Sequence, residues 1–198
     1  MNEQDRTLLE AAGRGDTTAV RAALAAGAAL EARDGHRRTA LLLASIGDHV
    51  GAARVLVAEG ADPDAQDDRD DSPWLATGVT GSVAMMRELL PAGPDLTLRN
   101  RFGGIALIPA SERGHVDYVR ALLRETDIDV DHVNNLGWTA LLEAVILGDG
   151  GPAHQEIVGL LLTAGATPGL PDGDGVTALT HAEQRGYTRI AELLRDAT

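Results

Sequence analysis

The side chains able to do acid–base chemistry are few in this chain, and they narrow the reactions open to it. There is no lysine and no cysteine, so Schiff-base chemistry, thiol nucleophiles and thiolate-bound metals are excluded. The candidates that remain are Glu112, Arg113, Glu143 and His181. A carboxylate beside an imidazole can exchange protons with a substrate, so Glu143 and His181 would form an acid–base site if the fold brought them together.

No recognised motif for metal or nucleotide binding occurs in the sequence. Aspartates gather at residues 67–71 and at 172–174, but neither group has the full ligand series or the final glutamate of a calcium loop. Aspartate is also common in turns, because its side chain bonds nearby backbone amides. The histidines lack metal-ligand spacing, and there is no G-x-S-x-G or G-x-G-x-x-G. We expect no metal, no cofactor and no enzymatic activity.

Charge and hydropathy limit the kind of partner and the compartment. The net charge is −13 at pH 7, which disfavours nucleic acid and anionic membranes, because phosphate binding depends on clustered basic residues. The longest apolar run, Ala22 to Leu30, is too short to span a bilayer. The polar first six residues do not resemble a secretion signal. We expect a cytoplasmic monomer.

The elements that must position these side chains follow a repeat. From Thr39-Ala40-Leu41, a step of 33 residues back leads to Arg6-Thr7-Leu8, and steps of 33, 33, 34 and 38 forward lead to Ser72-Pro73-Trp74, Ile105-Ala106-Leu107, Thr139-Ala140-Leu141 and Thr177-Ala178-Leu179. A second apolar segment follows each triplet, and most end in A-G-A, E-G-A or A-G-P. Threonine or serine can cap a first helix, and glycine can end a second one at positive φ. The period predicts an all-α stack of helix pairs.

This repeat resembles the ankyrin repeat family over essentially the whole chain. The resemblance is carried by the T-A-L triplets, R-G-H at residues 113–115 and G-A-D-P-D-A-Q-D-D from Gly60. It implies a single all-α domain, an ankyrin-repeat solenoid of stacked helix-turn-helix units joined by β-turn tips. The expected units are approximately residues 6–38, 39–71, 72–104, 105–138, 139–176 and 177–198, with the first and last acting as caps.

The sequence also departs from the family pattern. The fourth motif position never holds histidine; it holds Leu9, Leu42, Leu75, Ile108, Leu142 and Thr180. The fifth unit has five extra residues within the segment from Gly148 to Gln155. This segment falls between the two helices of the unit, where a loop can lengthen without breaking the stack.

The turn tips are candidate contact surfaces, because loops on a rigid scaffold often carry binding residues. The candidate residues there are His36, Arg69, Arg99, Arg101, Phe102, Asn134 and Asn135. The tips at residues 33–38 and 99–102 are basic, and those at 66–71 and 171–175 are acidic. The alternative is that neighbouring tips of opposite charge simply pair with one another.

The first helices are expected to line a concave wall. The candidate residues on it are Leu43, Ile46, Val79, Glu112, Arg113, Glu143, Ile146 and His181. An apolar centre with a polar border is typical of a protein-binding patch, although the apolar side chains could instead pack between repeats. The resemblance implies a non-catalytic module that binds another protein. The alternatives are a regulatory or chaperone-like subunit of a specific enzyme, and an enzyme with an acid–base site in this groove.

Overall fold

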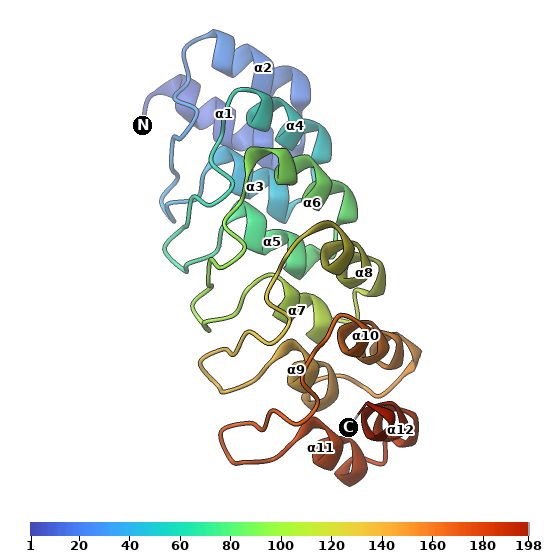
Figure 1. The fold of residues 1–198 in the computed structure, drawn as a ribbon. Coiled ribbons are helices and arrows are strands. Elements are labelled where there is room, and N and C mark those ends of the chain that lie inside the picture. Colours follow the sequence, from blue (N-terminus) through green and yellow to red (C-terminus); the bar gives the residue numbers. More distant parts are fainter. Residues whose placement is uncertain (198) are drawn as a thin grey trace. The chain divides into compact units, whose positions relative to one another are not determined.

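The computed structural model describes residues 1–197, and its regular elements are helices. By its internal contacts the chain divides into two compact units, Met1–Arg101 and Phe102–Thr198. Within each unit, three helix pairs follow one another along the chain (Figure 1). The all-α prediction is confirmed.

In the first unit, the first helices of the pairs pack in one row and the second helices pack in another (Figure 1). We call the two rows the inner and outer helices. The inner helices are α1 (Glu3–Arg14), α3 (Ala40–Ile46) and α5 (Pro73–Thr80). The outer helices are α2 (Thr17–Ala25), α4 (Val50–Ala58) and α6 (Val83–Leu89), and α6 continues into the short 3-10 helix η1 (Leu90–Ala92).

The second unit has the same arrangement. Its inner helices are α7 (Leu107–Glu112), α9 (Ala140–Ile146) and α11 (Ala178–Gln184). Its outer helices are α8 (Val116–Glu125), α10 (Pro152–Thr163) and α12 (Thr188–Asp196). In each row the middle helix contacts both of its neighbours, so apolar faces that one pair could not bury alone are shared between repeats.

The triplets begin the inner helices as their spacing predicts. In four of them the hydroxyl of the first residue accepts a hydrogen bond from the amide three residues later, at 3.2–3.3 Å; these N-caps are Thr39, Ser72, Thr139 and Thr177. Such a cap satisfies one backbone amide that the helix itself leaves without an acceptor. Helix α7 starts without a side-chain cap, because its triplet begins with Ile105.

The third triplet position supplies the core of both units. Leu41, Trp74, Leu107 and Leu141 are each no more than 2% exposed. Burying a large apolar side chain of this kind contributes about 1.5–3 kcal/mol. Trp74 differs from the three leucines in having a polar group, and this indole N–H is buried without a hydrogen-bond acceptor among the described residues.

The first helix differs from the sequence expectation. Helix α1 begins at Glu3, three residues ahead of the expected start of the first unit. Asn2 and Asp5 form a reciprocal capping box there, which fixes the helix start before the triplet position is reached. Thr7, aligned with the middle residue of the triplets, therefore lies inside the helix.

The longer loop of the fifth repeat lies between α9 and α10, as predicted. Hydrogen bonds that hold it include His154 Nδ1 to Asp149, His154 Nε2 to the Glu112 carbonyl, and the Tyr187 hydroxyl to the Gly148 carbonyl. A Cβ on Gly148 would lie 2.1 Å from the Ala144 carbonyl oxygen, so any other residue at this position would clash with the backbone.

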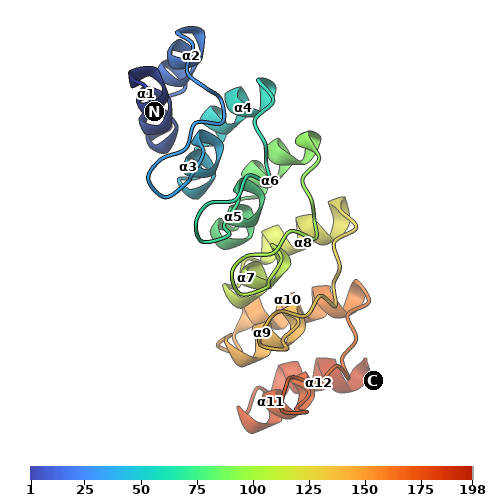
Figure 2. The same cartoon turned by 90° about the vertical axis from the view of Figure 1, so that its left-hand side faces the viewer.

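The turn tips of each unit project to the same side of its inner helices (Figures 1 and 2). Two residues before each triplet the backbone takes a positive φ; the residues are Arg37, Asp70, Gly103, Gly137 and Gly175. A left-handed residue at this place turns the chain back toward the helix start. The tips are thus a repeated, specified turn.

Candidate functional site

Each tip carries an aspartate or asparagine five residues before the triplet. In four tips its Oδ1 accepts hydrogen bonds from the amides two and four residues later; these residues are Asp34, Asp67, Asn134 and Asp172. The Oδ1 atom therefore makes the same two hydrogen bonds in these four tips. The other terminal atom, Oδ2 of aspartate or Nδ2 of asparagine, is available for a further contact, and the partner of that contact differs from tip to tip.

In the second unit this second atom connects the tip to the inner helix. Asn134 Nδ2 donates to Glu143 Oε1 at 2.7 Å, and Asp172 Oδ2 pairs with His181 Nε2 at 2.7 Å. Both pairs are nine residues apart. In the first pair the tip residue Asn134 is the donor and the helix residue Glu143 is the acceptor. In the second pair the tip residue Asp172 is the acceptor and the helix residue His181 is the donor, so the two roles are reversed as a pair.

Glu143 and His181 share no hydrogen bond or ion pair with each other. Each side chain is held by its own tip, Glu143 by Asn134 and His181 by Asp172. Each of these two inner-helix side chains therefore bonds to the tip that precedes its own helix.

Glu143 is a buried carboxyl group on the inner-helix face. It is 6% exposed. Burial, together with the nearby Glu112 carboxylate, raises the pKa of Glu143 to about 7, although the Asn134 hydrogen bond lowers it. Glu112, on the preceding inner helix, is half-buried. The Glu112 charge thus acts on the Glu143 carboxyl group, and near neutral pH Glu143 is only partly ionised.

We expect Glu143→Gln to raise the free energy of unfolding by about 2–3 kcal/mol at about pH 8. Because the pKa of this group rises from 4.5 to about 7 on folding, the native state binds the proton more tightly, and the wild type loses stability as pH rises between these values. Glutamine has no charge and keeps an oxygen that accepts from Asn134. Urea unfolding should show two nearly equal stabilities at about pH 4.5 and a growing gap above it. Parallel stability–pH curves for the two proteins would contradict this account.

Most of the exposed large hydrophobic side chains lie on tips or at the ends of inner helices. Ile46, Val79 and Leu147 are 40–50% exposed, and on the tips Phe102, Val133 and Leu136 are 47–55% exposed. Two predicted members of the apolar wall, Leu43 and Ile146, are half-buried instead. These two side chains therefore combine packing against their neighbours with partial exposure.

Phe102 and Leu136 occupy the same tip position in adjacent repeats, three residues before the triplet. The Asn135 amide donates to the Phe102 carbonyl at 2.9 Å, so the two tips lie against each other. Asn135 and Arg113 are exposed. Leu136 shares the register of Phe102, and that signal could have selected it as a site residue from the sequence.

In the first unit, neighbouring tips of opposite charge pair with one another. His36 lies 3.4 Å from Asp68, and Arg101 lies 3.6 Å from Asp71. Gln66 Nε2 donates to the Arg99 carbonyl at 2.8 Å. The charged tips therefore stabilise their own arrangement, as the pairing alternative anticipates.

A pocket of about 370 Å³ lies between these tips and helix α3. Its lining brings together three of the candidate residues, His36, Ile46 and Arg69, with acidic groups of the second tip. Burial and the neighbouring Asp67 raise the pKa of the Asp71 carboxyl, although Arg101 and Arg69 lower it. Opposite charges are thus balanced within this pocket.

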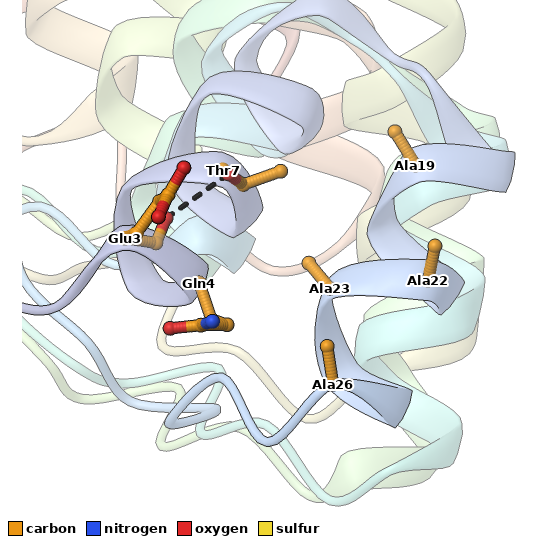
Figure 3. Close-up of a pocket in the computed structure, with 7 residues that line it drawn as sticks. All are labelled: Glu3, Gln4, Thr7, Ala19, Ala22, Ala23 and Ala26. Carbon is orange, nitrogen blue, oxygen red and sulfur yellow. Dashed lines mark hydrogen bonds between the residues drawn. The ribbon is translucent and has the colours of Figure 1, made fainter.

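A second pocket of about 370 Å³ lies on the outer face of the first repeat (Figure 3). Alanines of α2 line one side of it, and Glu3, Gln4 and Thr7 of α1 line the other (Figure 3). The Thr7 hydroxyl donates to the Glu3 carbonyl. The pocket is therefore lined by small apolar side chains on one side and by polar side chains on the other.

Metal binding and membrane crossing find no structural support in residues 1–197. No three His, Asp or Glu side chains in that part of the chain gather closely enough to hold a metal ion. No helix within it is both long and apolar enough to cross a bilayer.

Comparisons with known proteins agree with this architecture. The family model "Ankyrin repeats (3 copies)" matches residues 74–172, and the model "Ankyrin repeat" matches residues 36–68. The putative ankyrin repeat protein YahD of Escherichia coli K12 is 42% identical over 94% of this chain and 92% of its own length. An ankyrin repeat domain from Acinetobacter baumannii AYE is 48% identical, with 96% of each chain covered and a TM-score of 0.91. The ankyrin repeat protein EF0377 is 38% identical, with 98% of each chain covered and a TM-score of 0.92.

Proposed function

The chain belongs to the ankyrin repeat family, and we propose that it is a non-catalytic module that binds a partner protein through its turn tips and inner-helix faces. Ankyrin repeat proteins are generally protein-interaction modules. A fold does not name a partner, so function must be argued from the surface. The support comes from where apolar side chains are exposed.

One observation carries the proposal. Apart from Met1, every exposed large hydrophobic side chain among the described residues lies on a tip or at the end of an inner helix, and the outer helices contribute none. A random scatter of exposed apolar residues would need no explanation, whereas their collection on the tips and inner helices of each unit supports an interaction surface there. Phenylalanine and leucine flanked by polar groups are suited to anchor a partner.

Charge favours a protein over other macromolecules as the partner. With a net charge of −13, the chain repels phosphate-rich surfaces. The proposal accordingly excludes nucleic acid and membrane lipids and treats the chain as a monomer. The enzymatic alternative is not proposed, because Glu143 and His181 bond to separate tips.

We expect the double variant Phe102→Ala with Leu136→Ala to reduce capture of the partner at least about tenfold, the equivalent of about 1.4 kcal/mol. Both side chains are exposed, so their loss should leave the melting temperature nearly unchanged. The measurement is affinity capture from native cells followed by quantitative mass spectrometry, with wild type and variant side by side.

The matched control is Leu162→Ala, which shortens a half-buried leucine on the outer helix α10. Its capture should equal that of the wild type. Equal capture by the tip variant, or a loss with Leu162→Ala alone, would count against a binding surface on the tips.

A further inference from the structure

A continuous set of hydrogen bonds connects the two apolar tips of the second unit to its inner helix α9. The Phe102 carbonyl accepts from the Asn135 amide, and the Leu136 amide donates to Asn134 Oδ1 at 2.9 Å. The same Asn134 side chain donates to Glu143. The tip backbone that carries Phe102 and Leu136 is therefore connected through Asn134 to the Glu143 carboxyl group.

Glu112 and Glu143 differ from other glutamates of this unit in having no cation. Glu156, Glu183 and Glu192 each pair with an arginine. Neither Glu112 nor Glu143 has an ion pair with any described residue; Glu143 Oε1 accepts only from the neutral amide of Asn134, and Glu143 Oε2 has no hydrogen bond. Glu143 is only 6% exposed and thus keeps an unused acceptor atom, and the Glu112 charge acts on the same carboxyl group.

The chemistry of this pair selects the group that would bind it. Two nearby carboxylates in a partly water-excluded place repel each other, and a cation between them removes that repulsion. A metal ion would need further ligands, and no third acidic or histidine side chain gathers there among residues 1–197. A guanidinium or ammonium group needs only acceptors, and guanidinium offers several donors in one plane.

We propose that Phe102, Leu136, Glu112 and Glu143 form one docking surface for an extended segment of the partner protein that carries an arginine or lysine beside an apolar residue. This inference rests on the proposed function and names the chemistry of what is bound. The basic side chain bonds the two carboxylates, and the apolar one packs against Phe102 and Leu136. Charge complementarity with an acidic chain supports a basic segment over a second copy of this protein.

Binding at this surface is linked to loss of a proton. Near pH 7 the Glu143 carboxyl is about half protonated, because its pKa is about 7. Only the ionised form bonds the ligand cation well, so apparent affinity follows the ionised fraction. Affinity should therefore be about tenfold higher at about pH 8 than at about pH 6.

The helices packed against α9 also carry titratable groups. On α7 only Glu112 acts on the Glu143 carboxyl. On α10 His154 is held by Asp149 and the Glu112 carbonyl, and on α11 His181 is held by Asp172. Glu143→Gln removes the proton-linked step and leaves these histidines in place.

The test selects phage-displayed random peptides on the full chain at about pH 8, and then measures histidine-free synthetic versions by fluorescence anisotropy. We expect the selected peptides to share a basic residue next to an apolar one. Affinity should fall at least about tenfold for Glu112→Gln with Glu143→Gln, and for Phe102→Ala with Leu136→Ala. The charge-matched control Glu192→Gln, on the outer helix α12, should bind as the wild type does.

Several results would overturn the inference. The selection could yield no peptide, or peptides that lack a basic residue. The double variant Glu112→Gln with Glu143→Gln could bind the peptides as tightly as the wild type does. The affinity of Glu143→Gln could depend on pH as that of the wild type does. A dimer in sedimentation that Phe102→Ala dissociates would assign the surface to a second copy instead. If a partner protein is still captured through the tips, the proposed function stands without this inference; if none is captured, the proposed function itself fails.

Discussion

Asn134→Asp is expected to lower the free energy of unfolding by about 3–4 kcal/mol at about pH 8. Asn134 is 7% exposed, and its Nδ2 donates to Glu143, which is 6% exposed. The substitution keeps the oxygen that accepts from the Leu136 and Trp138 amides, so the turn itself can survive. It replaces the donor to Glu143 with a carboxylate oxygen, which both removes a hydrogen bond and places like charges in contact. At about pH 5 the two groups can share a proton, and the loss should be smaller.

A second substitution should restore most of this stability. Asn134→Asp together with Glu143→His recreates in the fifth repeat the pair that Asp172 and His181 form in the sixth. We expect a coupling energy of about 2 kcal/mol between the two changes in a double-mutant cycle, measured by urea unfolding at about pH 7. Gln184→Glu, which adds one negative charge at an exposed position of α11, controls for net charge and should change stability by less than about 0.5 kcal/mol. A double variant no more stable than Asn134→Asp alone would refute the exchange of donor and acceptor between tip and helix.

Trp74→Ala is expected to destabilise the first unit by about 3–5 kcal/mol, because it empties a large part of the core. Trp74 is fully buried in the position that leucine holds in the other triplets. Neighbouring repeats share this core, so the loss should be felt by α3 as well as α5. Circular dichroism during urea unfolding measures the effect.

Two comparison variants separate packing from chemistry at this site. Trp138→Ala removes the same side chain from a half-buried place, and should cost clearly less, about 1 kcal/mol. Trp74→Leu loses volume but also removes the buried indole N–H that has no acceptor, so it should cost less than Trp74→Ala. Equal costs for Trp74→Ala and Trp138→Ala would show that Trp74 does not hold the core as described.

The helix pairs could be predicted because their signals are local and repeated. Thr39 and Thr139 begin inner helices and cap them in the same way, as their shared T-A-L-L sequence indicates. The glycines that end α2 and α4, Gly27 and Gly60, take φ of 88° and 89°, as expected for left-handed termini. The start of α1 was not predictable from the triplets, because Asn2 and Asp5 impose an earlier one.

The sequence predicted the positions of only some of the candidate site residues. Register placed Phe102 on a tip and Ile46 and Val79 on inner helices, and all three side chains are exposed. Register also suggested that Glu143 faces His181, since both hold the same position in adjacent repeats. It could not show that a tip side chain reaches across nine residues to the helix that follows it. That contact depends on the turn bringing Asn134 and Asp172 over their own helices, which only the folded chain displays.

The central claim is that the tips and inner helices form the binding surface, and hydrogen–deuterium exchange of the chain alone and with its captured partner tests it most directly. The account predicts slower exchange on binding at residues 99–104 and 132–138, which include the apolar tips, and at the ends of the inner helices. The outer helices α2, α4, α6, α8, α10 and α12 should exchange at unchanged rates. Protection confined to the outer helices, with the tips unaffected, would contradict the claim.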